Sequence, residues 1–247
     1  MNGPQTFIRY AYPPNHLGYC GPGDAGALIE YGQAGQTDQG LHQLINAFDG
    51  AYPYLELIAH SAGIADPLDR RVVEAYWLGN GLLSAVTMPT LGTSMDDRFR
   101  SRTGRNWDHV AEAVWAGGLP HHSFHVFAVY PWAGLLRGGR IEEPLKVLDG
   151  CTIRWGRVLR AEDSGPIVEI APLEWSGGGL AFGSDHEEQV VASPFQPVEP
   201  GDWVSVHWNR VCGRLTDDQV RHLRAITGFH LRLVNQELSL PLATIAG

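Results

Sequence analysis

The pattern of helix and strand signals along the chain changes near residue 150, and this change limits the folds that the chain can adopt. Upstream of it, capping residues precede apolar positions at helical spacing. At Asp66 an N-cap residue is followed by Pro67 at the first helical position, and the apolar residues after it form one stripe that ends near Gly79. This half is therefore expected to be mainly helical. Further helices are expected after Thr37, over 54–62, and after the candidate caps Ser94 and Asn106.

Downstream of residue 150 the segments are short, rich in β-branched and aromatic residues, and separated by turns that contain Gly, Pro or Ser. Strands are expected over 152–159, 167–170 and 203–208. Thr216 then caps a last helix that carries apolar residues on one face as far as Val234. The predicted fold class is α+β: a mainly helical domain over residues 1–148, followed over residues 149–247 by a small β-barrel with a C-terminal helix.

Charge and composition exclude several classes of function. The 247 residues carry 27 acidic and 18 basic side chains, a formal net charge of −9. A nucleic-acid partner is not expected, because contact with phosphates needs a basic surface. The longest apolar stretch, 124–136, is interrupted by His125 and Pro131 and is too short to span a membrane. With three cysteines and no signal-peptide pattern, we expect free thiols and a cytoplasmic protein without a membrane partner.

Two separated motifs in the second half resemble the HypC family, the small chaperones that mature nickel–iron hydrogenases. The first is CTIRWGRV, which begins at Cys151, and the second is GDWVSVH, which ends at His207 and precedes the capped helix. The resemblance covers about residues 150–236 and implies an OB-like β-barrel. The chain departs from the family pattern where Cys151 is internal, where Trp155 replaces a proline and where Asn209 replaces a glycine.

The resemblance implies a role in handling iron, in the form of the fragment that carries cyanide and carbon monoxide. Carried over by motif, Cys151 is the expected iron ligand and His207 lies near it, as a second ligand or a proton acceptor. The implied partners are the hydrogenase large subunit or other maturation factors. The strings YCGPGD and PHHSFHVFAVYPWAGLLR also resemble a full-length family of uncharacterised proteins from GC-rich bacteria, associated with hydrogenase gene neighbourhoods.

The first half contains its own candidate metal ligands. His121, His122 and His125 fall within five residues, and His125 shares a face with His121 or with His122 if the segment is helical. Iron or zinc would accept two imidazoles and a carboxylate from elsewhere. Cys20 lies in a turn with Asp24 and is a further candidate ligand. The alternative is a histidine cluster that packs among aromatic residues and bonds to the backbone.

Three hypotheses follow. The first is an accessory protein of hydrogenase maturation, which is a chaperone or carrier of a metal fragment rather than an enzyme, and acts through Cys151 and His207. The second is an adaptor without chemistry, in which the barrel is only a binding surface. The third is a metal-dependent enzyme that uses the histidine cluster.

Overall fold

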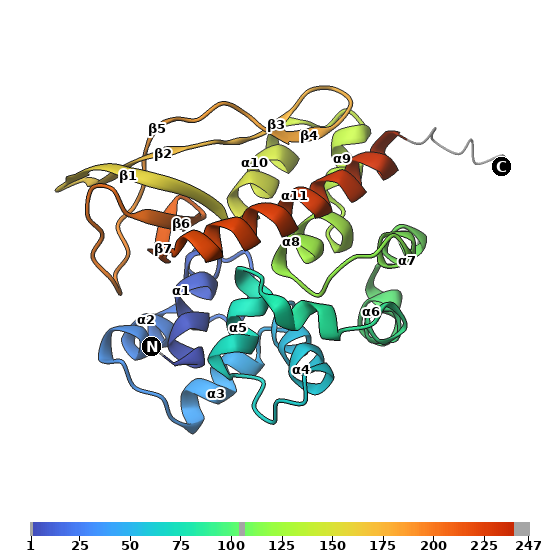
Figure 1. Ribbon diagram of the computed structural model, residues 1–247, viewed down its shortest axis with the longest axis horizontal. Coiled ribbons are helices and arrows are strands. Elements are labelled where there is room, and N and C mark those ends of the chain that lie inside the picture. The colour runs from blue at the N-terminus through green and yellow to red at the C-terminus, as the bar shows by residue number, and fades with distance from the viewer. Residues whose placement is uncertain (1, 104–106, 240–247) are drawn as a thin grey trace.

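The helices dominate the first two thirds of the chain in the computed structural model, which describes residues 2–103 and 107–239 (Figure 1). The N-terminal elements are α1 (Gly3–His16), α2 (Ala25–Ala34), α3 (Gln39–Asn46), α4 (Tyr52–Ser61), α5 (Arg70–Trp77) and the 3-10 helix η1 (Gly81–Ala85). They are followed by α6 (Met88–Thr103), α7 (Trp107–Trp115), α8 (His122–Phe124), the π-helical turn η3 (His125–Val129), α9 (Trp132–Arg137) and α10 (Glu142–Cys151).

The second part is a five-stranded antiparallel sheet and a long helix. The strands are β1 (Arg154–Glu162), β2 (Gly165–Ile170), β3 (Leu173–Trp175), β4 (Leu180–Phe182), β5 (His186–Gln189), β6 (Trp203–His207) and β7 (Arg210–Arg214), and α11 (Asp217–Ser239) follows them. The main sheet has the order β5-β2-β1-β6-β7 and is open, while β3 and β4 form a separate two-stranded sheet. A parallel bridge joins Val191, just after β5, to Arg210 of β7.

The predicted mixture of helices and strands is confirmed, with a helical N-terminal part and a helix at the C-terminal end. The predicted helices correspond to α3, α4, α5 and α11, and the three predicted strands to β1, β2 and β6. Ser94 as an N-cap is wrong, because it lies inside α6, where its hydroxyl accepts a hydrogen bond from Arg98. The cap predicted at Asn106 lies outside the described residues. The closed barrel is not confirmed, since the main sheet is open.

Helix α11 begins with a capping box. The Thr216 hydroxyl accepts from the Gln219 backbone N–H, and the Gln219 side-chain oxygen accepts from the Thr216 N–H. Figure 1 shows this helix running from the sheet across the front of α8 toward α9, and it packs against α7, α8, η3, α9 and β4. The last helix therefore belongs to both parts of the molecule.

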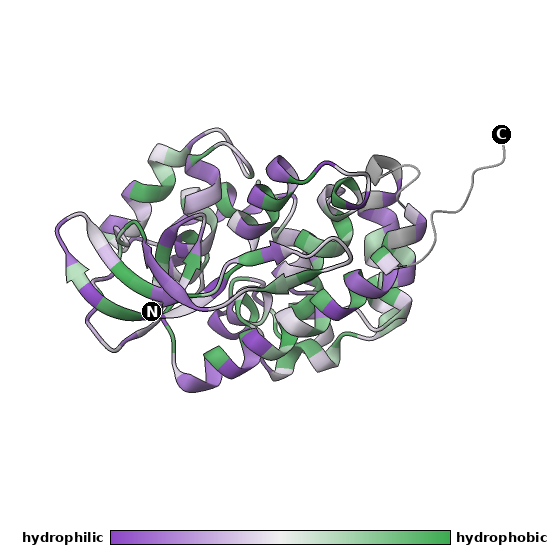
Figure 2. Cartoon of the chain, turned by 90° about the horizontal axis from the view of Figure 1, so that it is seen from above, coloured by the Kyte–Doolittle hydropathy of each residue, from purple (hydrophilic) through white to green (hydrophobic). Residues whose placement is uncertain are grey.

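Helix α1 joins the sheet to the helical part. Its residues Phe7 and Ile8 are fully buried in a core that also contains Ile153 and Cys212 from the second part. Hydrophobic and hydrophilic residues alternate along the same helices and strands, as burial of one face of each requires (Figure 2). The main core thus extends across residue 148. The boundary predicted there lies within α10, and independent folding of the two parts stays a prediction.

Two glycines, one within the first motif and one directly before it, are explained by close approach. A Cβ at Gly156 would lie 2.5 Å from the Glu169 carbonyl oxygen on the neighbouring strand. A Cβ at Gly150 would lie 2.9 Å from the indole of Trp208. Trp208 itself has φ 50°, a left-handed conformation that is rare for a bulky residue, in the tight turn between β6 and β7. Of the described helices, none is long and apolar enough to cross a membrane.

Candidate functional site

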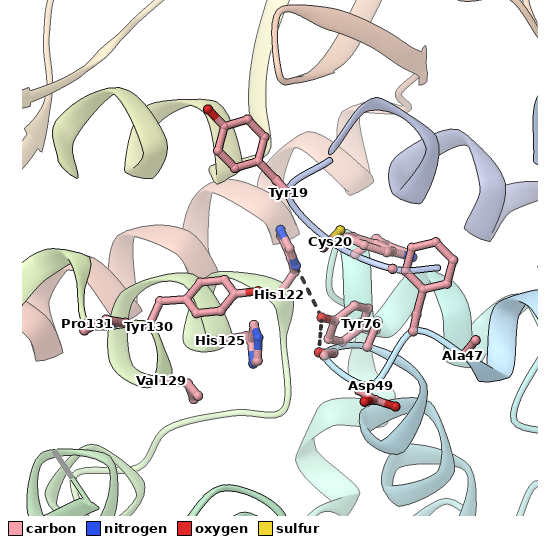
Figure 3. Close-up of a pocket in the computed structure, with 15 residues that line it drawn as sticks. Tyr19, Cys20, Ala47, Asp49, Tyr76, His122, His125, Val129, Tyr130 and Pro131 are labelled. Carbon is pink, nitrogen blue, oxygen red and sulfur yellow. Dashed lines mark hydrogen bonds between the residues drawn. The ribbon is translucent and has the colours of Figure 1, made fainter. Parts of the chain in front are cut away.

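A cavity of about 450 Å³ lies where four segments distant in sequence meet (Figure 3). These segments are the α1–α2 loop, the α3–α4 loop, the end of α5, and the region from α8 to Pro131. Its walls are mainly aromatic, with polar groups from histidine, tyrosine and cysteine. The lining residues are Tyr19, Cys20, Gly21, Ala47, Phe48, Asp49, Gly50, Ala51, Tyr76, Trp77, His122, His125, Val129, Tyr130 and Pro131.

The α1–α2 loop is fixed over this cavity by its own hydrogen bonds. The side-chain amide of Asn15, at the buried end of α1, donates to the carbonyl oxygens of Cys20 at 2.8 Å and Pro22 at 2.6 Å. Gly21 has φ 82°, and a Cβ there would lie 2.2 Å from the Phe48 ring. The loop therefore follows a path that only glycine permits at this position, and this path brings Cys20 to the cavity wall.

The opposite wall is shaped by the π-helical turn η3. The backbone N–H of Tyr130 donates to the His125 carbonyl oxygen at 3.1 Å, five residues earlier, so this turn is wider than an α-helical one. His125 and Tyr130 lie at its two ends, and their rings contact each other with centroids 4.6 Å apart. Both therefore face the same cavity.

His122 is held by hydrogen bonds at both ring nitrogens. Its Nε2 lies 3.1 Å from the Cys151 carbonyl oxygen, and its Nδ1 lies 3.3 Å from the Tyr76 hydroxyl. A carbonyl oxygen only accepts, so Nε2 carries the hydrogen and Nδ1 of the neutral ring is an acceptor. The Tyr76 hydroxyl also lies 3.1 Å from the Gly50 carbonyl oxygen. Figure 3 shows the hydrogen bond between His122 and Tyr76 along the cavity.

His125 bonds to a different partner. Its Nδ1 lies 3.1 Å from the Tyr54 hydroxyl, which also lies 3.4 Å from the Met95 sulphur. The Nε2 side faces Gly50, where a Cβ would approach Nε2 to 3.2 Å. Gly50 therefore keeps the space beside this imidazole open.

Burial keeps the imidazoles, the phenols and the thiol of the cavity uncharged. It lowers the pKa of His125 to about 3 and holds the pKa of His122 well below its ordinary value, with His207 as the second cause for His122. Burial also raises the pKa of the Tyr76 and Tyr130 hydroxyls, and raises the pKa of the Cys20 thiol to about 12. At neutral pH the imidazoles are therefore unprotonated bases, and the phenols and the thiol keep their protons.

His121 points away from this cavity. Its Nδ1 accepts from the backbone N–H of Ser123 at 3.1 Å and lies 2.8 Å from the Ser123 hydroxyl. That hydroxyl lies 2.7 Å from Nδ1 of His230 in α11, and the Nε2 of His230 accepts from the Leu119 N–H. The three histidines of the predicted cluster thus bond to three separate partner sets. Among the described residues, no group of three or more His, Cys, Asp or Glu side chains is arranged to hold a metal ion.

The structure brings Cys151 and His207 close together, although they come from the end of α10 and the end of β6. The residues next to them are joined directly, since the Trp208 N–H donates to the Gly150 carbonyl oxygen at 2.9 Å. The His122 ring lies 5.2 Å from the His207 ring, and the same His122 bonds to the Cys151 carbonyl oxygen. One member of the histidine cluster therefore joins the predicted Cys151 and His207 pair.

His207 is 1% exposed, and its surroundings leave one nitrogen without a partner. Its Nδ1 lies 2.8 Å from the Tyr10 carbonyl oxygen, so Nδ1 carries the hydrogen. Nε2 then carries a lone pair and has no hydrogen-bond partner among the described residues. Burial lowers the pKa of His207 to about 4. Val204 and Val206 point to the opposite face of β6, into a cluster made largely of valines, as strand alternation predicts.

The Cys20 thiol lies close enough to the Cys151 thiol to affect its ionisation. Burial raises the pKa of Cys151 to about 12, and Cys20 is the second cause of this shift. Above them the exposed Tyr19 ring stacks on Trp208, with centroids 3.8 Å apart. Cys212 is fully buried in β7.

Several residues of the site were not expected from the sequence. Tyr76 lies on the apolar stripe of α5 and reads there as a core residue, while Tyr54, Tyr130 and His230 carry no motif. The hydroxyls of Tyr76 and Tyr54 and the imidazole of His230 meet groups between 26 and 111 positions away. The only local signal was the density of histidines at 121–125, which placed His122 and His125 among the candidates but gave them a metal rather than tyrosines as partners.

Comparison with known proteins gives a family without an assigned activity. The chain matches the model of a family of unknown function, DUF6390, over residues 1–240. No curated protein and no solved structure matches it.

Proposed function

Because the chain belongs to the DUF6390 family of unknown function over residues 1–240, we propose its role from the site itself: it binds a small uncharged molecule in the cavity between His122 and Tyr19. The observation that carries this proposal is the gathering of buried, uncharged bases and phenols around one cavity of about 450 Å³, a size within the usual range of ligand pockets. Clusters of strongly shifted ionisable groups beside a cavity are typical of functional sites.

The walls favour a flat ligand with an apolar body. The rings of Tyr19, Phe48, Trp77 and Tyr130 line the cavity, and aromatic rings bind flat apolar groups well. An anionic ligand would lose its hydration without meeting a positive charge on His122 or on the phenols, and it would also face the acidic side chain of Asp49, which lines the cavity. The cavity therefore suits an uncharged molecule better than an anion.

The experiment is to extract the ligand. The protein is purified from its native host, denatured in organic solvent, and the released small molecules are identified by mass spectrometry. A second preparation carries Ala47→Trp, which fills the cavity mouth from an exposed position at the C-terminal end of α3. The control Ala34→Trp adds the same ring at an exposed helix end that lines none of the cavities named here. We expect a stoichiometric compound with the wild type and Ala34→Trp but not with Ala47→Trp, and equal recovery from all three would refute ligand binding here.

A second candidate function is an accessory role in nickel–iron hydrogenase maturation, as the HypC resemblance implies. The strand order supports it, because β5-β2-β1-β6-β7, with a parallel bridge between its two edges at Val191 and Arg210, is the order of a five-stranded, partly open OB-like barrel. Seven buried residues, six of them valine, fill the space enclosed by these strands. The adjacency of Cys151 and His207 is a second support, since the motif comparison expected it.

In this role the iron fragment is the cargo, and Cys151 and His207 are the residues that would hold it. The unpartnered Nε2 of His207 offers a lone pair, and a soft thiolate suits low-spin iron once its proton is displaced. The test is an infrared spectrum of anaerobically purified protein in the cyanide and carbonyl stretching region. Bands lost in Cys151→Ala but retained in Cys212→Ala, a buried cysteine of β7, would support the role. Absence of bands from protein that still binds its partner would leave the adaptor hypothesis.

A further inference from the structure

On the cavity wall formed by His122, Tyr76 and Gly50, two hydrogen-bond acceptors share a single donated hydrogen. Two groups along it only accept, namely Nδ1 of neutral His122 and the carbonyl oxygen of Gly50. The Tyr76 hydroxyl lies within hydrogen-bonding distance of both, at 3.3 Å and 3.1 Å, and it has a single hydrogen. Whichever acceptor receives that hydrogen, the other is left without it.

The other bonds of His122 do not relieve this shortage. Its Nε2 hydrogen is used by the Cys151 carbonyl oxygen, and burial together with the nearby His207 prevents a second proton on the ring. None of the described backbone N–H groups donates to the Gly50 carbonyl oxygen in the turns and caps around it. Gly50, Tyr76 and His122 all line the cavity.

On the basis of the proposed ligand-binding function, we propose that this cavity selects an uncharged flat ligand that donates a hydrogen bond, such as a primary amide, to the His122–Tyr76–Gly50 wall. A donor placed there bonds to one acceptor and leaves the Tyr76 hydrogen to the other. All three wall groups are then satisfied. The ligand therefore completes a hydrogen-bond set that the protein alone leaves incomplete.

The same wall rejects a carboxylate. A carboxylate offers only lone pairs, which would face Nδ1 of His122 and the Gly50 oxygen, and a single Tyr76 hydrogen would then be shared among three acceptors. The phenol of Tyr130 and the thiol of Cys20 line the cavity outside this three-residue wall, and although each can donate a hydrogen, neither carries a positive charge to offset the anion. The expected order of affinity is therefore donor first, neutral acceptor second and anion last.

Three probes of nearly the same shape separate these cases. Benzamide carries an N–H donor, methyl benzoate has none, and benzoate is the anion. Dissociation constants are measured by NMR titration of the tryptophan indole signals, which include Trp77 on the cavity wall. We expect benzamide to bind about tenfold more tightly than methyl benzoate, the effect of one satisfied buried acceptor, and benzoate to bind most weakly. Ala47→Trp should abolish binding of benzamide, while Ala34→Trp should not.

The variant Tyr76→Phe sharpens the test. It removes the Tyr76 hydroxyl hydrogen and leaves both acceptors in place, so the benzamide to methyl benzoate ratio should stay at about tenfold or increase. A ratio near one in the wild type, or a fall to one in Tyr76→Phe, would overturn donor selection. So would benzoate binding as tightly as benzamide. In each of these cases the cavity still binds ligands and the proposed function stands, whereas failure of all three probes together with the absence of an extracted ligand would refute both.

Discussion

The Ser123 hydroxyl is expected to be one of the most important polar atoms for stability, and Ser123→Ala measures its contribution. The hydroxyl lies between Nδ1 of His121 at 2.8 Å and Nδ1 of His230 at 2.7 Å, and all three residues are less than 5% exposed. Because the Leu119 N–H donates to Nε2 of His230, the hydrogen of that neutral ring is on Nδ1 and is donated to the serine oxygen. The serine hydrogen is then donated to His121.

The cost of Ser123→Ala follows from what each histidine retains. His121 loses one of its two donors but keeps the backbone N–H of residue 123, so this loss is about 1 kcal/mol. His230 is left with a buried donor and no acceptor, which costs about 1–3 kcal/mol. We expect the free energy of unfolding to fall by about 2–4 kcal/mol, measured by urea denaturation at pH 7.5.

A double-mutant cycle checks the cause. With His230→Phe the stranded donor is absent, so Ser123→Ala should cost only about 1 kcal/mol on that background. The control Ser84→Ala removes an exposed hydroxyl that donates to a nearby carbonyl oxygen and should change the unfolding free energy by less than about 0.5 kcal/mol. A cost of Ser123→Ala below about 0.5 kcal/mol, or the same cost with and without His230, would refute the assigned hydrogen positions.

Three further predictions concern acid, a glycine and the thiols. Burial lowers the pKa of His121 and His125 to about 3 and of His207 to about 4, so the unfolded chain binds more protons below pH 6.5. The free energy of unfolding should therefore be highest above pH 6.5 and fall by about 1.4 kcal/mol per histidine per pH unit toward pH 4. A urea midpoint that stays constant from pH 7 to pH 5 would contradict this. Gly150→Ala should destabilise the fold by about 1–3 kcal/mol, because the added Cβ meets Trp208 at 2.9 Å, whereas Gly178→Ala, with open space around it, should be nearly neutral in thermal unfolding. Since burial raises the pKa of Cys20 and Cys151 to about 12 and also raises that of Cys212, Ellman's reagent at pH 8 should react slowly with the native protein and release three equivalents of thiol after denaturation; fast reaction of Cys20 would show that its thiol is activated.

The elements that local sequence signals could identify are those with caps or strong periodicity. The capping box at Thr216 and the stripe after Asp66 correctly located α11 and α5. Short edge elements were not predicted, since β5 (HEEQ) contains only polar residues and β7 contains a glycine, and neither shows the β-branched pattern of a strand. Ser94 was misassigned because a serine within a helix and a serine at its cap look alike without the surrounding chain.

The adjacency of Cys151 and His207 had a different origin. It was expected from the order of two motifs and not from any local rule, and its physical cause in this chain is the close fit of Gly150 against Trp208. That fit holds Trp208 at φ 50° despite the strain of this conformation for a bulky side chain. A comparison of motifs could therefore identify the pair, whereas the left-handed conformation of Trp208 and its stacking on Tyr19 came only from the structure.

The chemistry of the cavity depends on hydrogen positions, and these are decided by long-range contacts. The five-residue run 121–125 has three identical imidazoles, yet His121 accepts at Nδ1 from a serine while His122 donates at Nε2 to a backbone carbonyl 29 residues away. Sequence spacing treats these rings as interchangeable metal ligands. Both rings carry their hydrogen on Nε2, so it is their different partners that make His121 part of the α11 interface and His122 the acceptor of a cavity wall. Because the shortage of one hydrogen at that wall arises from Tyr76 lying between two acceptors, the ligand preference belongs to this three-way contact and not to any single residue.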